Sequence, residues 1–310
     1  MLNYLESLTV QLAQAAAELP AAVRDRHARF LREQLRADGG FAGREGGSDL
    51  YYTGFGLRSL AILGELDDEI AARAREFLRS RLQREESIVD FFSLIYGAKL
   101  LEAANGDDLF ADQATDWADA VSKFLLSLRR TDGGFAKGAA GTASSTYHSF
   151  LVLLCLQLID RPLPEPDRLV EFILSQACDE GGFREIRVSK RAGTNPTAAA
   201  IGVLQILDCL HDATRNHTVQ FLCEMQTDSG GLRANTRIPI ADGLSTFTGL
   251  WSLNNLNPDA PVDWQAAGEY IASLENSDGG FHGAEWDLAC DVEYTFYGLA
   301  SMALIQSRTG

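Results

Sequence analysis

The chain has 310 residues, of which 46% are apolar and 23% are charged, proportions typical of a globular protein with a sizeable core. Its net charge of −16 argues against a nucleic-acid partner and against docking on anionic lipid, because both need a dominant basic face. The longest apolar run, residues 150–159, is too short to cross a bilayer, so we expect no membrane span.

The N-terminal segment and the cysteines both favour a cytoplasmic protein. The segment carries Glu6 early and has no basic stretch before its apolar residues, so no signal peptide is visible. The five cysteines are scattered and lack CxxC spacing, which is typical of a reducing compartment. We therefore expect a cytoplasmic location.

A pair of glycines recurs along the chain and marks turns between helices. The first glycine of each pair is residue 39, 133, 181, 230 or 279, which gives spacings of 94, 48, 49 and 49. Since 94 is about twice 47, a degenerate copy is expected between the first two turns, with helices over residues 69–83 and 87–102. Periods of this size indicate stacked helical hairpins. About six hairpins account for nearly the whole chain, so we predict a single domain, 1–310, with a lead-in helix within residues 1–20.

Charged and apolar helices alternate in chain order after this lead-in helix. The charged ones are predicted over residues 22–35, 69–83, 109–128, 167–177, 212–225 and 263–274. The apolar ones are predicted over residues 48–63, 87–102, 144–159, 195–210, 245–256 and 291–306. A helix that is apolar all round is buried on all sides. The alternation predicts an all-α fold, an α-α toroid (α6/α6 barrel) whose inner helices enclose a central cavity.

Aromatic side chains gather at the starts of the predicted inner helices, just after the glycine turns. We interpret them as the lining of a deep apolar pocket suited to a long hydrocarbon ligand. The alternative is that they only fill a core. The set is Tyr51, Tyr52, Phe55, Tyr147, His148, Thr197, Phe247, Trp251, Tyr294 and Tyr297.

The repeats resemble those of the prenyltransferase/squalene-cyclase superfamily. Two segments, LCEMQTDSGGL at 222–232 and SDGGFHGAEWDLACDVEYTFYGLASMALI at 277–305, are similar to the β subunit of protein prenyltransferases, in particular the Rab geranylgeranyltransferase type. The resemblance implies an α-α toroid with a central isoprenoid pocket, an isoprenoid diphosphate as ligand and a helical-repeat partner subunit.

The same resemblance implies a catalytic zinc held by an Asp, by a Cys two residues later and by a His that starts the last inner helix. These positions fall on Asp242, Leu244 and Tyr294. Leu has no donor atom and neutral Tyr is a poor zinc ligand, which argues against the usual zinc-thiolate mechanism. The resemblance leaves open a Mg²⁺ ion that binds together with a diphosphate substrate. An alternative is a shifted metal site, although carboxylates at helix starts are usually caps. Its candidate ligands would be Asp242, Asp287, Cys290, Asp291 and Glu293.

The family's diphosphate clamp is altered too, because its His, Arg and Lys fall near Gly193, Thr236 and Pro239. Basic residues nevertheless crowd the same two loops, which predicts an electropositive rim for a diphosphate. The alternative is that they are solvated loop charges. These residues are Arg184, Arg187, Lys190, Arg191, Arg233 and Arg237.

We therefore predict an enzyme of prenyltransferase or terpenoid type that works on an allylic diphosphate. Lys190, Arg191, Arg233 and Arg237 would neutralise the leaving diphosphate. Asp242, Tyr294 and His148 would orient an acceptor or move a proton. The DxDD acid motif of the related cyclases is absent from the sequence. The alternatives are a non-catalytic isoprenoid- or lipid-binding protein without the metal site, and a scaffold whose ring is filled by side chains.

Overall fold

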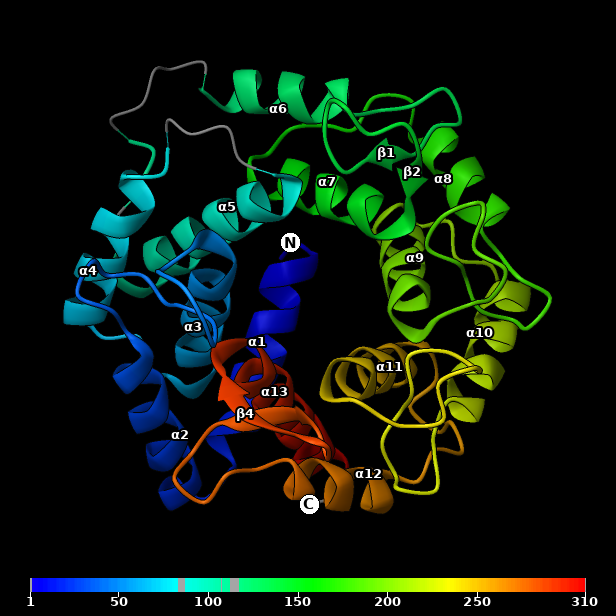
Figure 1. Cartoon of the computed structure of the whole chain (residues 1–310). Helices are drawn as coiled ribbons and strands as arrows, with labels where there is room; N and C mark the ends of the chain where they lie inside the picture. Colours follow the sequence, from blue (N-terminus) through cyan, green and yellow to red (C-terminus); the bar gives the residue numbers. More distant parts are fainter. Residues whose placement is uncertain (1, 83–86, 107, 112–116, 310) are drawn as a thin grey trace. The chain divides into compact units, whose positions relative to one another are not determined.

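The computed structural model describes residues 2–82, 87–106, 108–111 and 117–309, and over these ranges the chain is predominantly helical (Figure 1). Its contacts divide it into two compact units, Met1–Thr115 with Ile271–Gly310, and Asp116–Tyr270. The two ends of the chain therefore belong to the same unit. Within the described ranges, no helix is long and apolar enough to cross a membrane.

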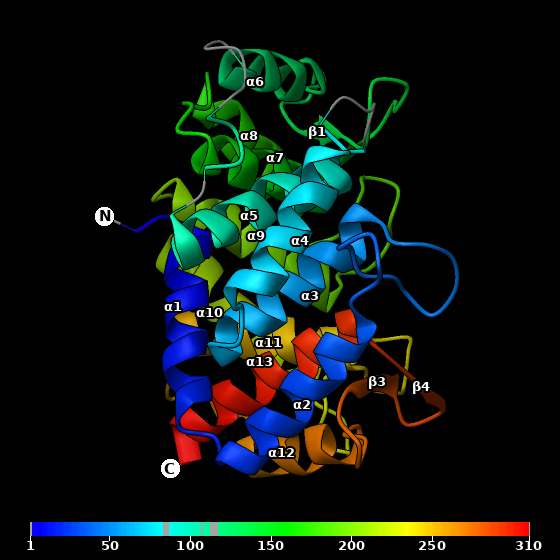
Figure 2. The same ribbon diagram turned by 90° about the vertical axis from the view of Figure 1, so that its left-hand side faces the viewer.

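The first unit is built on three inner helices, with α3 packed against both α5 and α13. The outer helices α2 and α4 pack on α3 and α5, and the lead-in helix α1 lies against α3 and α13 (Figures 1 and 2). An antiparallel hairpin, β3 with β4, leads directly into α13 (Figure 2). The bounds are α1 Tyr4–Ala17, α2 Ala21–Gln34, α3 Leu50–Leu63, α4 Asp68–Arg79, α5 Ile88–Asn105, β3 Phe281–Ala284, β4 Asp287–Asp291 and α13 Val292–Thr309.

The second unit repeats the same arrangement. Its inner helices α7, α9 and α11 pack side by side, with α9 in the middle, and the outer helices α6, α8 and α10 pack against them. A two-residue ladder, β1 with β2, leads into α7. The bounds are α6 Trp117–Ser127, β1 Phe135–Ala136, β2 Ser144–Ser145, α7 Thr146–Leu158, α8 Pro166–Ser175, α9 Thr194–Ile206, α10 Asp212–Glu224, α11 Gly243–Leu256 and α12 Trp264–Ser273, whose last residues belong to the first unit.

Burial separates the inner and outer helices as predicted from their composition. In the inner helix α7, the six consecutive residues Leu151–Leu156 are all buried. In the outer helix α4, burial is confined to Ile70, Ala71, Ala74, Phe77 and Leu78, the one-sided stripe of a surface helix. The core of each unit therefore lies on and between its inner helices.

Three predicted helices are clearly shorter than expected. The helix predicted over 109–128 begins only at Trp117, because Leu109–Ala111 form a turn; residues 112–116 lie outside the described part. The helix predicted over 195–210 ends at Ile206. There Asp208 adopts a φ of 54° and the N–H of Cys209 donates to the carbonyl of Leu204, which closes the helix end. The helix predicted over 69–83 ends at Arg79, because residues 80–82 form a turn; Gln83 lies outside the described residues.

Each of the first four glycine pairs docks its turn on the outer helix of the following hairpin. Gly230 has a φ of +92°, and a Cβ atom there would lie 2.1 Å from the carbonyl oxygen of Ala266. A Cβ on Gly231 would lie 2.4 Å from the ring of Tyr270. Each pair therefore turns the chain and, because glycine has no side chain, also leaves room for the neighbouring helix to pack closely. Equivalent contacts join Gly40 to Phe77, Gly134 to Phe172 and Gly182 to Phe221.

A hydroxyl group completes every one of these turns. The residue after the glycine pair donates its backbone N–H to a Ser or Thr in the first turn of the inner helix, as Phe183 does to Thr197 at 2.8 Å. Thr197 is fully buried, so it belongs to this repeated turn and not to a pocket lining as predicted. The equivalent pairs are Phe41 with Thr53, Phe135 with Ser149, Leu232 with Thr246 and Phe281 with Thr295.

The last turn docks on the first outer helix, α2. The N–H of Gly280 donates to His27 Nδ1 at 3.0 Å, and His27 Nε2 lies 2.9 Å from Glu275 Oε1. The fully buried His27 ring stacks on Phe281 at 4.9 Å. A Cβ on Gly280 would lie 2.8 Å from the Phe30 ring. These contacts join the first and last hairpins of the chain.

Candidate functional site

An aromatic cluster joins the inner helices α3 and α13 in the first unit. We call Tyr51, Phe55, Phe296 and Tyr297 the aromatic cluster. Phe55 is its centre, with ring centroids 5.0 Å from Tyr51, 5.7 Å from Phe296 and 5.3 Å from Tyr297. Phe55, Phe296 and Tyr297 are buried, and Tyr51 is half-buried. The predicted aromatic residues Tyr51 and Tyr297 are thus brought together.

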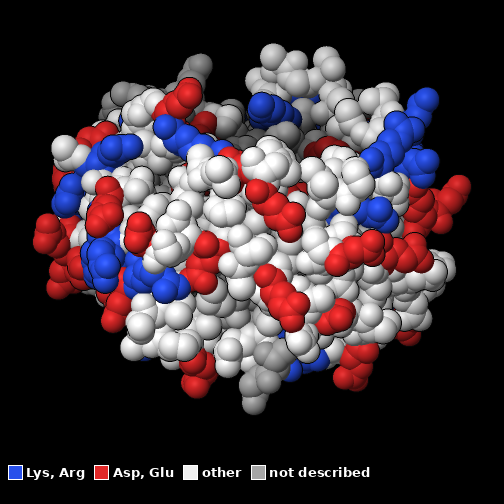
Figure 3. Space-filling view, turned by 60° about the horizontal axis from the view of Figure 1, so that its bottom comes forward, with Lys and Arg blue, Asp and Glu red and all other residues white. Residues whose placement is uncertain are grey.

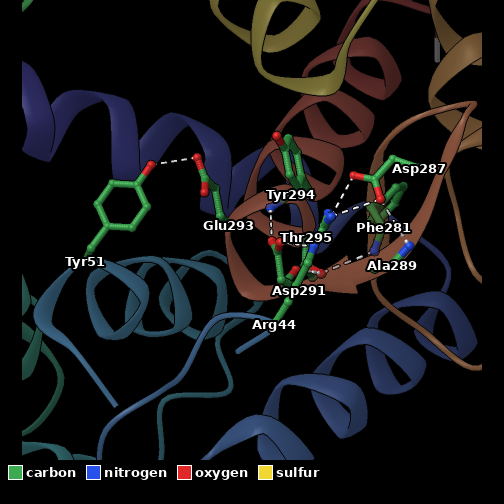
Figure 4. Close-up of polar contacts among 9 residues, drawn as sticks. All are labelled: Arg44, Tyr51, Phe281, Asp287, Ala289, Asp291, Glu293, Tyr294 and Thr295. Carbon is green, nitrogen blue, oxygen red and sulfur yellow. Dashed lines mark hydrogen bonds and ion pairs between the residues drawn. The ribbon is translucent and has the colours of Figure 1, made fainter. Parts of the chain in front are cut away.

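A carboxylate faces this cluster from the first turn of α13. The Tyr51 hydroxyl donates to Glu293 Oε1 at 2.6 Å, and the two side chains point toward each other (Figure 4). Burial raises the pKa of Glu293 above its ordinary value, while the hydrogen bond from Tyr51 opposes this shift. Glu293 is therefore a half-buried carboxyl group whose protonated form is favoured by its surroundings. Such a group can exchange a proton with a neighbouring molecule.

Arg44 fixes the segment that carries Glu293. Its Nε donates to Asp291 Oδ2 at 2.9 Å, and its Nη1 lies 2.8 Å from Asp287 Oδ2 (Figure 4). Asp291 also accepts the N–H of Tyr294 at 2.9 Å and so caps α13. Burial raises the pKa of Asp291, against the lowering effects of the Tyr294 N–H and of Arg44. Asp287 and Asp291, two of the candidate ligands of the predicted shifted metal site, are thus engaged with Arg44.

Tyr294, predicted as a catalytic residue, lies beside this network. The Arg44 guanidinium carbon is 5.4 Å from the centroid of its ring, and the Tyr297 ring is at 6.4 Å. A Cβ on Gly283 of β3 would lie 2.6 Å from the Tyr294 ring, so the hairpin packs closely on it. Tyr294 is half-buried, between the polar network and the aromatic cluster.

Asp242 caps α11 in the second unit. Its Oδ1 accepts the N–H of Ser245 at 2.7 Å and its Oδ2 accepts the Ser245 hydroxyl at 2.8 Å. Burial raises its pKa, against the effect of these hydrogen bonds from Ser245. This is the cap considered from the sequence, and a chemical role for Asp242 stays a prediction. Among the described residues, no group of three or more His, Cys, Asp or Glu side chains is arranged to hold a metal ion.

His148, the third predicted catalytic residue, contacts the cap of α7. Its Nδ1 lies 2.8 Å from the Ser145 hydroxyl, which also donates to the carboxylate of Glu185. Burial, followed by the charge of Lys137, lowers the pKa of His148. Burial raises the pKa of Glu185. His148 therefore belongs to a small polar cluster of the second unit; its neighbour Tyr147 is 39% exposed.

The two predicted basic loops lie against each other in the second unit. The N–H of Thr194 donates to the carbonyl of Ala234 at 2.9 Å, and its hydroxyl donates to the carbonyl of Arg233 at 2.6 Å. Gly193 also pairs with Asn235. The two loops are therefore adjacent within this unit.

The basic side chains of these loops have different surroundings. Arg233 donates to the carbonyl of Glu224, the last residue of α10, and Arg191 pairs with Glu180. Lys190 and Arg237 are exposed, and neither has an ion pair within the described residues. One face of the molecule shows Asp and Glu spread widely, with Lys and Arg in smaller groups (Figure 3). The remaining predicted aromatic residues, Phe247 and Trp251, are buried on α11.

Sequence reasoning missed Arg58 and Arg44. Arg58 is the sole charged residue of α3, whose sequence is LYYTGFGLRSLAIL, and a single charge in a buried helix is a signal that could have been used. Its guanidinium carbon lies 3.9 Å from the Phe55 ring centroid. Arg44 has no comparable signal, because its partners are more than two hundred residues away in sequence.

Comparisons with solved structures show the fold of the chain. A Candida albicans protein geranylgeranyltransferase-I structure complexed with GGPP matches with a TM-score of 0.74 and 16% identity, covering 91% of both chains. The type II terpene cyclase MstE from Scytonema, with bound geranylgeranyl dihydroxybenzoate, matches with a TM-score of 0.61 and 14% identity, covering 97% of this chain and 99% of the cyclase chain. An Actinoplanes protein matches with a TM-score of 0.62 and 14% identity, covering 93% and 98%.

A search of curated proteins finds no match. The sequence matches the model of one protein family, the prenyltransferase alpha-alpha toroid domain. The two matched segments, residues 3–107 and 72–309, together span almost the whole chain. The predicted all-α toroid class and the resemblance to this superfamily are thereby confirmed. With its docked helix hairpins and this match along its length, the chain belongs to the prenyltransferase alpha-alpha toroid domain family.

Proposed function

We propose that the chain is a terpenoid-processing enzyme of prenyltransferase or terpene cyclase type, which holds an isoprenoid chain against the aromatic cluster. The observation that carries this proposal is the contact between Tyr51 and Glu293 at the edge of that cluster. Similar structures carry GGPP or geranylgeranyl dihydroxybenzoate, so an isoprenoid ligand is consistent with the fold.

The aromatic cluster supports carbocation chemistry. Ring faces attract a positive charge through their quadrupole, and each such contact contributes about 0.5–2 kcal/mol. The Arg58 guanidinium already lies 3.9 Å from the Phe55 centroid, so this environment would come from the rings of Tyr51 and Tyr297, which flank Phe55. A carbocation formed on an isoprenoid chain would therefore be stabilised beside them and shielded from water.

Glu293 is proposed to transfer the proton. In its protonated form it donates a proton to one carbon of a double bond. The π electrons form the new C–H bond, and the positive charge stays on the other carbon. The carboxylate that remains is stabilised by the hydrogen bond from Tyr51, which strengthens as the charge develops. The raised pKa of Glu293 increases its protonated fraction near neutral pH.

The test compares turnover and binding in Glu293→Gln. Farnesyl and geranylgeranyl compounds are incubated with the protein, products are identified by mass spectrometry, and binding is measured by calorimetry. We expect turnover to fall by at least about 100-fold, and the dissociation constant to change less than about threefold. The matched control is Glu285→Gln, an exposed carboxylate between β3 and β4.

Unchanged turnover in Glu293→Gln would exclude its role in proton transfer. Tight binding with no turnover in the unaltered protein would instead favour the alternative, a non-catalytic isoprenoid-binding protein. If the unaltered protein shows neither binding nor turnover of these compounds, the proposed function is contradicted.

A second proposal concerns the two basic loops, which we infer bind an anion such as a diphosphate. The backbone bonds that join them support this, as do the exposed Lys190 and Arg237 with no ion pair in the described part of the chain. Arg191, which pairs with Glu180, and Arg233, which donates to the Glu224 carbonyl, would add positive charge beside the bound anion. Mg²⁺ could accompany a bound diphosphate.

Removing Lys190 and Arg237 tests this second proposal. Each charge-assisted contact is worth about 1.5–3 kcal/mol, so Lys190→Ala/Arg237→Ala should weaken the binding of inorganic diphosphate more than tenfold. The control is Arg29→Ala/Lys123→Ala, which removes two exposed positive charges from outer helices. Equal loss in both double variants would mean that only net charge matters, and would contradict a specific anion site.

A further inference from the structure

Arg58 lies inside a box of aromatic rings in the first unit. Its guanidinium carbon is 3.9 Å from the centroid of the Phe55 ring and 5.1 Å from that of Phe296. The ring centroids of Tyr96 and Phe92 lie at 5.6 and 5.8 Å. These four rings, which we call the Arg58 box, come from three different inner helices, α3, α5 and α13. A single cation thus lies where three inner helices meet.

The walls of the Arg58 box are buried and held in place. Phe55, Phe92, Tyr96 and Phe296 are each less than 8% exposed. The Tyr96 hydroxyl is hydrogen-bonded to Thr9 of the lead-in helix, and Arg58 Nε donates to the carbonyl of Gly54 at 2.9 Å. The guanidinium group is therefore oriented by the protein before any ligand binds.

Arg58 itself is half-buried and has no ion pair within the described residues. Arg26, Arg32 and Arg44 of the same unit pair with carboxylates, whereas Arg58, like Arg29, has no such pair among the described residues. Acidic residues outnumber basic ones in the chain by 43 to 27, so a partner would be easy to supply. The terminal N–H groups of this half-buried guanidinium group can donate to water or to the acceptor atoms of a ligand.

We infer that Arg58 binds the carboxylate of an apolar acid, and specifically of an isoprenoid acid or an isoprenoid-bearing aromatic acid. This inference rests on the proposed function and names its substrate class. A guanidinium group presents two parallel N–H groups, which match the two oxygens of a carboxylate. The half-buried ring of Tyr51, 5.0 Å from Phe55, then offers apolar surface to the hydrocarbon part of the ligand.

The charges near Arg58 favour a ligand with one negative charge. Arg58 is a single cation, and burial favours the uncharged form of Glu293 although Arg58 and Arg44 act to lower its pKa. A diphosphate carries more negative charge than one guanidinium group can neutralise. A carboxylate needs only the single cation that the box supplies.

The experiment compares ligands that differ only in their head group. Calorimetric titrations at pH 7.5 use the acid, alcohol and diphosphate of the farnesyl and geranylgeranyl series. The unaltered protein should bind the acid at least about tenfold more tightly than the alcohol, because one charge-assisted contact is worth about 1.5–3 kcal/mol. Arg58→Met should remove this preference and leave alcohol binding within about threefold.

Arg58→Lys keeps the charge without the planar fork, and we expect it to retain only part of the preference. Thermal unfolding of each variant verifies that it is folded, and Arg29→Met, on the exposed face of α2, is the matched control. If Arg58→Met does not fold, the preference for the acid over the alcohol is compared between the unaltered protein and Arg58→Lys. An equal preference in these two proteins would contradict the inference.

Equal binding of acid and alcohol by the unaltered protein would overturn this inference and leave the isoprenoid proposal standing. A diphosphate preference that disappears in Arg58→Met would also overturn it, because the head group would then be a diphosphate. No binding of any compound would contradict both the inference and the proposed function.

Discussion

Carboxylates at the starts of the inner helices have two kinds of role in this protein. Asp242 and Asp291 each accept a backbone N–H three residues ahead, so both are caps that hold the first turn of a helix. Glu293 lies in the first turn of α13 and instead accepts a hydrogen bond from Tyr51 of another helix. A cap is engaged locally whatever the ligand, whereas Glu293 is placed by tertiary contacts beside the aromatic cluster.

Asp242 provides a test of this distinction at the level of one residue. Asp242→Ala should lower the free energy of unfolding by about 0.5–2 kcal/mol, because the first turn of α11 loses its cap, while Asp242→Asn should retain most of the stability. Chemical denaturation followed by circular dichroism measures both.

If Asp242 only caps, Asp242→Asn should also keep its turnover. A loss of turnover in a fully stable Asp242→Asn protein would restore the catalytic role predicted from the sequence, since Asn caps well but cannot exchange a proton.

Helix elements are joined by turns that depend on small residues and on one buried hydroxyl group. The glycine pair admits the backbone and the aromatic side chain of the next outer helix, as Gly230 and Gly231 do for α12. The hydroxyl of the inner helix then satisfies the backbone N–H that follows the pair.

Gly231→Ala tests the close packing of the turn. The added methyl group would lie 2.4 Å from the Tyr270 ring, so we expect a loss of about 1–3 kcal/mol in the free energy of unfolding. Gly138→Ala is the control, because a Cβ there has no atom within 4 Å. Similar stability of the two variants would contradict the packing argument.

Thr197→Val tests the repeated hydroxyl. Valine has nearly the same shape but leaves the buried N–H of Phe183 without its acceptor, so stability should fall by about 1–3 kcal/mol. Thr197→Ser should recover most of the loss, because the hydroxyl is restored. A valine variant as stable as the serine variant would show that the hydrogen bond contributes little. Urea unfolding of both proteins gives the comparison.

At the scale of the whole molecule, the first and last hairpins are held together by a buried histidine. His27 joins α2 to Gly280 and to Glu275, at sequence separations of 253 and 248 residues. The hydrogen bond with His27, together with that from Arg26, lowers the pKa of Glu275. The contact between the two ends of the chain is therefore sensitive to acid.

Glu275→Gln should reduce stability at pH 7 by about 1–3 kcal/mol, because a charged acceptor is lost. The folded pKa of Glu275 lies below its unfolded value of about 4.3, so the unfolded chain binds more protons between the two. The contribution of Glu275 is complete above about pH 4.3 and disappears as the pH falls through the folded pKa.

Urea unfolding at pH 7, 5 and 3 measures this dependence. The difference between Glu275→Gln and the unaltered protein should persist at pH 5 and shrink at pH 3. Glu33→Gln, an exposed change on α2, is the control. A difference that stays constant at all three pH values would exclude the titration of Glu275 as its origin.

The order and the type of the helices follow from the sequence by itself. The glycine pairs recur at a nearly constant spacing, and apolar segments such as α7 are too uniformly apolar to be anything but buried. The cap at Asp242 could also be predicted, because a cap depends only on residues within one turn. Such features are local in sequence, so neighbouring residues suffice to determine them.

Only the tertiary structure decided which polar groups meet. Arg233 is directed to the end of α10, whereas Arg58 lies among rings from three helices and Tyr51 meets Glu293 across 242 positions of sequence. These contacts depend on how each hairpin is rotated and docked on the next. The repeat spacing carries no information about that rotation, because it arises from the packing of side chains that are distant in sequence.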